Sequence, residues 1–304
     1  MFVEKSVEKF AASMSEDKNA LSLKTGRGGC EVFKIIYKDR EAVIKIGASE
    51  LGRSEIMNNK VSYFEMEKLG ISQIVAPKIF AEGDSNGMSY IILEYLGTDF
   101  RNRSTKNQKT IEMTKVMFKR LEEAYKISLN QDAYSSQKWL EDRKQDILRY
   151  FEIYLIPSGF GNNSDVTKIK NLDLGKMSPN KFTWATRDLT PDNIFVNEER
   201  LTIIDAKAGA KGVPILDLAM FATLTGEVYS LPNGYESAKL AKNFANEIAE
   251  KTLGTPFGNE LFKFGEIFQY ALSVRFRKNK DPRSPAFIES IRERVEDISV
   301  AIRK

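Results

Sequence analysis

The strongest constraint on the fold is a polar segment that two apolar runs follow. The segment places Asp188 and Asn193 five residues apart, and the runs occupy residues 194–196 and 201–204. Two β-branched runs joined by a short turn predict a β-hairpin. Because a hairpin returns the chain to its starting edge, we expect Asp205, at its far end, to lie beside Asn193. Three oxygen-bearing side chains around one point would suit Mg²⁺, which takes one or two protein carboxylates and keeps water and phosphate ligands.

A simpler interpretation of the same residues is an ordinary polar turn. Asp, Thr, Pro and Asn are common turn residues, and residues 186–193 are rich in them. On this interpretation the hairpin carries no chemistry. Evidence from other segments of the chain is therefore needed to distinguish an ordinary turn from a metal site.

The absence of histidine excludes several kinds of catalysis. With no histidine among its 304 residues, the chain can form no Ser-His-Asp or Cys-His active site, no histidine general base and no His/Cys zinc site. Its chemistry must rest on carboxylates, lysine and an oxygen-bound metal.

Charge and hydropathy narrow the set of partners. The 46 basic and 42 acidic residues are interleaved, so we expect no nucleic-acid partner. No run is long and apolar enough for a transmembrane helix, and the N-terminus lacks the apolar segment of a signal peptide, so we expect no membrane association. A single cysteine rules out an internal disulfide and favours a cytoplasmic location. The oligomeric state is not indicated.

The N-terminal part predicts a helix and a small antiparallel sheet. Apolar residues recur at helical spacing over residues 2–14, and strands are expected at residues 21–23, 32–37 and 42–46. Between the first two strands lie Gly26, Gly28 and Gly29. Glycines there let backbone amides approach phosphate oxygens, although most such glycine loops are ordinary hairpin turns.

Lys45 stands in the middle of the third apolar strand. A buried ammonium needs an anionic partner, whereas on an edge strand the same lysine would point to water. A helix over residues 54–69 should follow, with Met57, Val61 and Phe64 on one stripe.

The rest of the chain divides the molecule into a β-rich part and a helical part. Strands at residues 74–80 and 89–95 bring the total to five, and the composition turns polar after Leu96-Gly97. We expect a domain boundary there, with domains of 1–97 and 98–304. Residues 157–179 resemble a surface excursion before a strand at 182–185. Helices are expected over residues 113–125, 139–155, 236–253, 257–278 and 285–302.

One further segment points to a family. Residues 212–219 read Gly-Val-Pro-Ile-Leu-Asp-Leu-Ala, with Asp217 as the acidic member. This segment resembles the G-x-P-x-x-D-L-A motif of the aminoglycoside phosphotransferase and choline kinase-like family, within the protein-kinase-like superfamily. The D-x-x-x-x-N spacing of Asp188 and Asn193 and the lysine-bearing strand resemble the same superfamily. The resemblance implies an α+β, two-lobed kinase fold with a small antiparallel N-lobe and a larger, mainly helical C-lobe.

The resemblance also implies roles for the polar residues. Asp188 would be the catalytic base, Asn193 and Asp205 would hold metal, and Asp217 would be structural, hydrogen-bonding the backbone of the catalytic loop. Lys45 would hold the α- and β-phosphates of ATP.

The nucleotide would be held by further N-terminal groups. Lys45 would pair with a glutamate of the helix that follows its strand; Glu55 is favoured, with Glu65 next and Glu67 also open. Glu94 and Tyr95 lie where the family offers backbone groups to adenine. Gly26, Gly28 and Gly29 would cover the phosphates.

The chain departs from the family pattern at three places. Thr186 stands where the family usually has histidine, Arg187 stands where small-molecule kinases often have glycine, and no D-F-G follows Asp205. The stretch from Asp205 to Asp217 is too short for an activation loop with its peptide-docking segment. This short stretch favours a small or unusual acceptor over that of a general Ser/Thr protein kinase.

The resulting functional hypothesis is an ATP- and Mg²⁺-dependent kinase that phosphorylates a hydroxyl of a small molecule. The alternatives are a protein-directed kinase, such as a bacterial toxin or effector, and a nucleotide-binding pseudokinase. The acceptor itself is not indicated. A basic cluster could favour an acidic acceptor or could be a solvated helix end; it consists of Arg275, Arg277, Lys278, Lys280 and Arg283.

Overall fold

The chain forms two compact units in the computed structural model. Unit 1 comprises Met1–Thr98 with Thr202–Gly209, and unit 2 comprises Asp99–Leu201 with Ala210–Lys304. The structure describes residues 2–25, 29–68, 70, 74–107, 109–129, 133–197, 200–206, 211–277 and 283–303. The chain thus leaves unit 1 after Thr98 and returns to it for one short segment.

Unit 1 is built on a five-stranded antiparallel sheet in the order β1-β2-β3-β6-β5. Every residue of β3 is in register with β2 on one side, and all but Glu41 are in register with β6 on the other. The strands are β1 (Leu21–Thr25), β2 (Cys30–Ile36), β3 (Glu41–Gly47), β5 (Ile79–Ser85) and β6 (Met88–Glu94). The three strands predicted first, and the last one, lie within two residues of their predicted positions.

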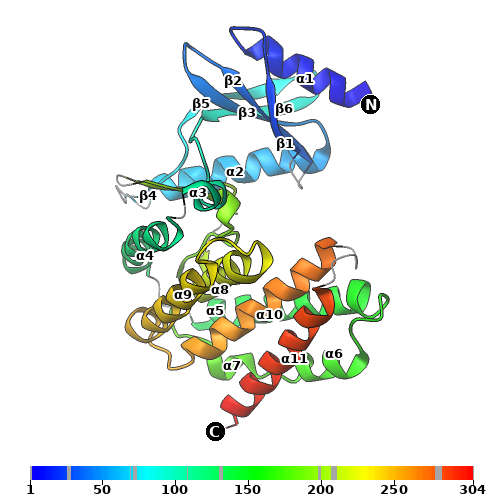
Figure 1. Cartoon of the computed structure of the whole chain (residues 1–304), viewed down its shortest axis with the longest axis vertical. Coiled ribbons are helices and arrows are strands. Elements are labelled where there is room, and N and C mark those ends of the chain that lie inside the picture. The colour runs from blue at the N-terminus through cyan, green and yellow to red at the C-terminus, as the bar shows by residue number, and fades with distance from the viewer. Residues whose placement is uncertain are drawn as a thin grey trace. The chain divides into compact units, whose positions relative to one another are not determined.

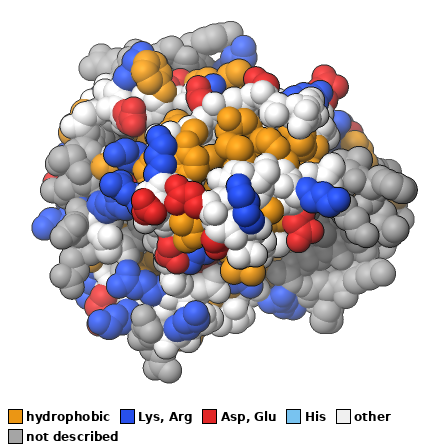
Figure 2. Space-filling view, turned by 90° about the horizontal axis from the view of Figure 1, so that it is seen from above, with side chains coloured by type: hydrophobic (Ala, Val, Ile, Leu, Met, Phe, Trp, Pro, Cys, Tyr) orange, Lys and Arg blue, Asp and Glu red, His pale blue; other side chains and the backbone are white. Residues whose placement is uncertain are grey.

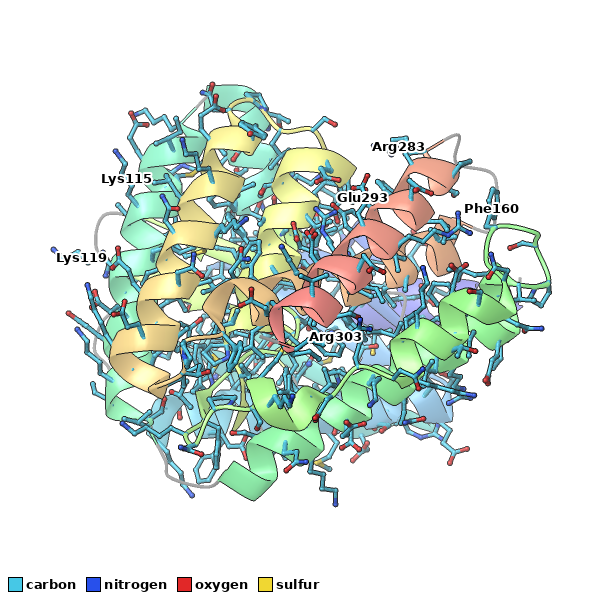
Figure 3. The ribbon with its side chains drawn as sticks, turned by 90° about the horizontal axis from the view of Figure 1, so that it is seen from below. Lys115, Lys119, Phe160, Arg283, Glu293 and Arg303 are labelled. Carbon is cyan, nitrogen blue, oxygen red and sulfur yellow. The ribbon has the colours of Figure 1, made fainter. Side chains whose placement is uncertain are left out.

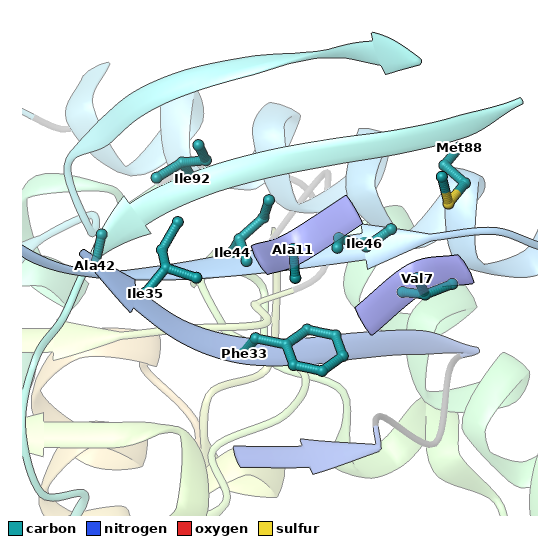
Figure 4. Packing of buried hydrophobic residues seen from close by; sticks show 9 residues of the cluster. All are labelled: Val7, Ala11, Phe33, Ile35, Ala42, Ile44, Ile46, Met88 and Ile92. Carbon is teal, nitrogen blue, oxygen red and sulfur yellow. The ribbon is translucent and has the colours of Figure 1, made fainter. Parts of the chain in front are cut away.

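One face of this sheet is covered by the predicted N-terminal helix α1 (Phe2–Met14). Side chains alternate across a strand, so Ala42, Ile44 and Ile46 of β3 point to the same face. There they join Val7 and Ala11 of α1 in a single buried cluster, which Figure 4 shows from close by. The helix is therefore part of the core of unit 1.

The opposite face of the sheet packs against α2 (Glu50–Lys68), and Figure 1 shows α1 and α2 on opposite sides of the strands. The predicted helix is present, but it begins four residues earlier. Its predicted apolar stripe is exposed, since Met57, Val61 and Phe64 keep 57%, 40% and 57% of their surface. The face turned inward carries smaller and polar residues; it consists of Gly52, Ile56, Asn59, Ser62, Tyr63 and Met66.

The prediction of one continuous strand over residues 74–80 is wrong. The structure has a short β4 (Ile74–Val75), a break, and then β5, which runs to Ser85. Pro77 stands in the break, and proline has no backbone N–H to donate to a sheet. The sheet still contains five strands because β5 extends beyond the predicted segment.

Unit 2 is mainly helical, as predicted. Its N-terminal part contains α3 (Phe100–Asn107), α4 (Thr110–Ile127), α5 (Ala133–Tyr150), a π-helical turn (Phe151–Leu155), α6 (Asn163–Lys170) and α7 (Leu174–Met177). Its C-terminal part contains α8 (Ile215–Thr223), α9 (Gly234–Ile248), α10 (Gly258–Arg277) and α11 (Ser284–Ala301), with π-helical turns at Leu224–Val228 and Ala249–Leu253. Figure 3 shows Lys115 and Lys119 on the outward side of α4.

Short strands accompany these helices. They are β7 (Thr183–Trp184), β8 (Ile194–Val196) and β10 (Lys211–Gly212). The strand β9 (Leu201–Ile203) contains the point where the chain passes into unit 1.

Two segments of unit 2 differ from the prediction. Residues 157–179, expected as a surface excursion, contain α6 and α7. Helix α6 begins with a capping box, in which Asn162 and Asp165 each accept a backbone hydrogen bond from the other. Helix α8 was not predicted, because all nine of its residues are buried and a helix that is buried on every side lacks the polar face that makes a helical period visible.

Helix α10 packs against both α8 and α11. A Cβ atom at Gly265 would lie 2.6 Å from Cβ of Ala219, so the glycine allows α8 and α10 to approach closely. This packing supports α8, which carries Asp217.

The surface carries charges of both signs. Figure 2 shows basic and acidic side chains interleaved around a band of hydrophobic side chains on one face. Among the helices of the described residues, none has the length and hydropathy needed to cross a membrane.

Candidate active site

The centre of the candidate site in unit 1 is the Lys45 ammonium group. Lys45 is only 5% exposed, and its Nζ lies 2.5 Å from Oε1 of Glu55 and 2.7 Å from Oδ1 of Asp205. It also donates a 2.8 Å hydrogen bond to Oδ1 of Asn59. Of the three glutamates considered for the partner of Lys45, the structure brings Glu55 to it. The bond to Asp205 joins residues 160 positions apart in sequence.

Helix α2 supplies three polar side chains to this cluster. Glu55, Asn59 and Tyr63 are spaced four residues apart and therefore lie on one face of the helix. Tyr63 is 2% exposed, and the backbone N–H of Asp205 donates a hydrogen bond to its hydroxyl. The sequence analysis missed Asn59 and Tyr63, although their spacing from Glu55 was a signal that could have found them.

Electrostatics in this cluster favour charged lysine. Burial of the Lys45 ammonium lowers its pKa, but the nearby carboxylates of Asp205 and Glu55 outweigh this, and its pKa lies above the ordinary value of 10.5.

Cys30, at the start of β2, is fully buried. Burial, and then the charge of Glu55, raise the pKa of its thiol to about 12.

Asp205 has an unusual backbone conformation. Its φ is +56°, in the left-handed region that few non-glycine residues adopt. Its side chain is 35% exposed, and its contact with Lys45 uses Oδ1. The carboxylate is thus partly open to solvent at the point where the chain has re-entered unit 1.

Asp217 holds the predicted catalytic loop in unit 2 through hydrogen bonds. Oδ2 of Asp217 accepts hydrogen bonds from the Thr186 hydroxyl at 2.9 Å and from the Arg187 backbone N–H at 3.1 Å. The Thr186 hydroxyl in turn accepts the backbone N–H of Asp188 at 3.2 Å. Asp217 therefore bonds the loop backbone, as the resemblance implied. Thr186, noted only as a departure from the family, connects Asp217 to Asp188.

Asp217 is a buried carboxyl group. Burial raises its pKa to about 6, although the hydrogen bonds from Thr186 and Arg187 act in the opposite direction. Arg187, whose N–H makes one of these bonds, has φ of +60°. The left-handed backbone explains why glycine suits this position in the family pattern.

Asp188 and Asn193 lie at the two ends of the loop. Pro191–Asn193 form a 3₁₀ turn with proline in its first position. Nδ2 of Asn193 donates to the Asp188 carbonyl at 3.3 Å, and the Asn193 backbone N–H donates to the Thr190 carbonyl at 2.9 Å. The amide nitrogen of Asn193 is thus used within the loop, which leaves Oδ1 as its acceptor for other groups.

A third group of residues holds the turn and was missed by the sequence analysis. Asp192 accepts from Nη1 of Arg101 at 3.3 Å and from the Tyr229 hydroxyl at 2.8 Å. The Arg101 guanidinium also lies 4.0 Å from the Tyr229 ring centre. Arg101 comes from α3, and Tyr229 directly follows the π-helical turn after α8. No spacing in the sequence links these residues.

The remaining predicted residues are only partly described. Gly26 and Gly28 lie outside the described residues. Gly29 has φ of +86°, and a Cβ there would lie 3.0 Å from the Ser49 hydroxyl. Glu94 exchanges hydrogen bonds with Lys78, whose N–H donates to Oε1 of Glu94 at 3.1 Å.

Tyr95 and the predicted basic cluster complete the set. The ring of Tyr95 lies 4.1 Å from Nζ of Lys34. Of the basic cluster, Lys278, Lys280 and the side chains of Arg275 and Arg277 lie outside the described residues. Arg283 donates to the carbonyls of Glu227 and Val228.

The donor chemistry fits a hard cation. Asn193 offers an amide oxygen in unit 2, and Asp205 offers a partly exposed carboxylate in unit 1; both are oxygen ligands of the kind Mg²⁺ takes. Within the described residues, no group of three or more Asp, Glu, Cys or His side chains forms a metal cluster. Mg²⁺ does not need one, because it is bound through one or two carboxylates together with phosphates.

The fold is similar to that of solved kinase-like structures. No protein-family model matches the sequence, and no curated protein matches it. Solved structures do match in fold, and those found include aminoglycoside phosphotransferases and choline kinases.

Three of these structures show the extent of the likeness. A protein from Haemophilus somnus assigned as a fructosamine-3-kinase matches with a TM-score of 0.60 at 16% identity over 97% of each chain. A choline/ethanolamine kinase family protein from Mesorhizobium loti matches with 0.54 at 14% identity over 100% of this chain and 96% of its own. An aminoglycoside phosphotransferase from Streptomyces rimosus matches with 0.55 at 10% identity over 88% and 98%. At these identities the likeness is one of fold.

Proposed function

We propose that this protein is a kinase that transfers the γ-phosphoryl group of ATP, with Mg²⁺, to a hydroxyl of a small molecule. The observation that carries the proposal is the buried ammonium of Lys45, bound to both Glu55 and Asp205. Burying a lysine and two carboxylates removes their charges from water, which costs free energy of folding. A role in binding explains why the chain keeps these charges. The pair that Lys45 forms with Glu55 of the following helix is the ion pair that phosphate binding by a protein-kinase fold requires.

The proposed reaction assigns one task to each group. Lys45 binds phosphate oxygens of the nucleotide, and Asn193 and Asp205 would hold Mg²⁺, which would neutralise phosphate charge. Asp188 orients the acceptor hydroxyl and takes its proton. The acceptor oxygen forms a bond to the γ-phosphorus as the bond between that phosphorus and the β–γ bridging oxygen breaks, and ADP leaves. Catalysis then rests on orientation and electrostatics.

The nucleotide and the acceptor would bind mainly through different parts of the chain. Residues 1–97 would bind ATP, with Gly26, Gly28 and Gly29 at the phosphates and the backbone of Glu94 and Tyr95 at adenine. Residues 98–304 would supply the catalytic loop and the acceptor site. A small acceptor is supported by the short segment between Asp205 and Asp217, which leaves little chain for docking a peptide.

Thermal unfolding with and without Mg-ATP tests nucleotide binding. At about 100 times Kd a ligand adds roughly 2.7 kcal/mol of stability, which at roughly 2–4 °C per kcal/mol for a somewhat smaller chain raises Tm by several degrees. We expect this shift in the wild-type protein and its loss in Asp205→Ala. An unchanged Tm at millimolar Mg-ATP would exclude the proposed nucleotide site.

Turnover tests the role of Asp188. Asp188→Asn should bind Mg-ATP as the wild type does and lose at least about 10²-fold in kcat. Asp142→Asn is the matched control, because Asp142 is an exposed carboxylate on α5 of the same unit. Retained turnover in Asp188→Asn would remove Asp188 from this role. Incorporation of labelled phosphate into a protein band, and not into metabolites, would favour the protein-directed alternative.

A further inference from the structure

The Lys45 ammonium group has its full set of hydrogen-bond acceptors. An ammonium carries three N–H donors, and three acceptor atoms lie within 2.8 Å of Nζ: Oε1 of Glu55, Oδ1 of Asp205 and Oδ1 of Asn59. If Lys45 binds a nucleotide phosphate, as the proposed function requires, one of these acceptors has to leave it.

The three acceptors differ in how easily they can leave. The side chain of Asp205 is 35% exposed, so water can replace lysine at its carboxylate. The side chain of Glu55 is 23% exposed and its Oε2 is buried, so water reaches this carboxylate less easily. Asn59 is only 3% exposed. If its amide oxygen lost Lys45, that oxygen would be buried without a replacement donor, which is costly. Asn59 is therefore the acceptor that stays, and Asp205 is the most accessible one to exchange.

The position of Asn59 suits it to this task. It lies one helical turn after Glu55 and one turn before Tyr63, on the face of α2 that is turned to the sheet. Tyr63 accepts the backbone N–H of Asp205, so Asp205 can remain anchored through its main chain while its carboxylate moves. An amide also adds no charge. A third carboxylate at this position would repel the phosphate that Lys45 has to attract.

We propose that Asn59 is a positioning residue for nucleotide binding, whose amide oxygen keeps the Lys45 ammonium oriented while Asp205 exchanges with a phosphate. The inference rests on the proposed function and adds a residue to it. On this inference, the polar face of α2 is the part of unit 1 that orients the Lys45 ammonium. Neither the hydrophobic pattern of α2 nor the spacing of its glutamates pointed to this role.

The first test is a titration with a fluorescent ATP analogue, trinitrophenyl-ATP, with Mg²⁺. Asn59→Leu keeps the branched shape and the number of heavy atoms of the side chain but removes the acceptor, and we expect about tenfold weaker binding, typical of losing a hydrogen bond to a charged group. Asn58→Leu is the matched control, since the same substitution falls on the neighbouring, exposed asparagine of the same helix; it should bind as the wild type does. Equal affinity in the two leucine variants would overturn the inference.

The second test needs no nucleotide. A double-mutant cycle of Asn59→Leu and Lys45→Met, measured by urea unfolding, should be non-additive because the two side chains bond directly. The cycle of Asn58→Leu and Lys45→Met should be additive. If Asn59→Leu does not fold, Asn59→Ser replaces it in both tests, because a serine hydroxyl is too short to reach Nζ from that position. Additivity in the Asn59 cycle would show that Asn59 only fills space.

The outcomes separate this inference from the proposed function. If the wild type does not bind the ATP analogue, the kinase proposal fails and the inference falls with it. If the wild type binds the analogue but Asn59→Leu binds equally well, only the inference fails. Weaker binding by Asn59→Leu together with a non-additive cycle supports both.

Discussion

At the scale of single residues, backbone conformation explains one departure from the family pattern. Arg187 has φ of +60° and donates its N–H to Asp217. An L-residue with a Cβ is strained in this region by roughly 1–2 kcal/mol, whereas glycine is not. The chain therefore tolerates a strained residue immediately before Asp188.

This strain can be measured by comparing two truncations of the same side chain. Arg187→Gly and Arg187→Ala both remove the guanidinium, so their difference isolates the backbone, and we expect the glycine variant to be more stable by about 1 kcal/mol in urea unfolding. At the exposed helical position Lys115 the order should reverse, because glycine in a helix is about 1 kcal/mol worse than alanine. Alanine being the better residue at both positions would contradict the assignment.

Asp217 should make stability depend on pH. Its folded pKa of about 6 lies above the ordinary value of 3.8, so the folded state binds the proton more tightly than the unfolded state does. The resulting contribution to stability is fully present below about pH 4 and is lost as pH rises through about 6.

Urea unfolding between pH 4 and 8 checks this sign. In Asp217→Asn the component that falls with rising pH should disappear, while the amide oxygen can still accept the bonds from Thr186 and Arg187, both of which go to Oδ2. The exposed Asp142→Asn should follow the wild-type curve. Parallel curves for wild type and Asp217→Asn would contradict the prediction.

At the scale of elements, the sequence pattern of α2 predicted a helix but not which of its faces is buried. The apolar spacing of Met57, Val61 and Phe64 predicted a helix correctly, but these residues are exposed. The inward face is occupied by residues that hold Lys45 and Asp205, and polar residues there do not produce an apolar stripe. When the buried face of a helix carries the polar residues of a site, the hydrophobic pattern of the sequence does not show which face is buried.

Two methionines of this helix provide a matched test. Met66 is 1% exposed and Met57 is 57% exposed. Met66→Ala should cost about 2–5 kcal/mol in the free energy of unfolding, whereas Met57→Ala should change it by less than about 0.5 kcal/mol. The change in helix propensity is the same in both variants. Similar losses at the two positions would show that the exposed stripe packs against something in solution.

At the scale of the whole molecule, the order of elements was predictable and the contacts were not. Strand alternation and helical spacing placed β1, β2, β3, β6, α1, α2, α4, α5, α9, α10 and α11, because local patterns determine local structure. They did not place α6, α7 and α8. The bond between Lys45 and Asp205 spans 160 positions, and only the family resemblance linked the two residues. Thr186 and Arg101 were missed because their partners, Asp217 and Asp192, lie 31 and 91 positions away. Asn59 lies only 14 positions from Lys45 and was missed although its spacing from Glu55 was a signal.

The position of Lys45 within the sheet has a consequence for hydrogen exchange. Strand β3 is the central strand, and between Ala42 and Gly47 it is in register with a neighbour on each side. Its amides should exchange with solvent only in the rarest openings of unit 1. The main chain that carries the ammonium is therefore a fixed reference point. Any adjustment to a bound phosphate falls to the groups outside the sheet, namely α2 and the segment that follows β9.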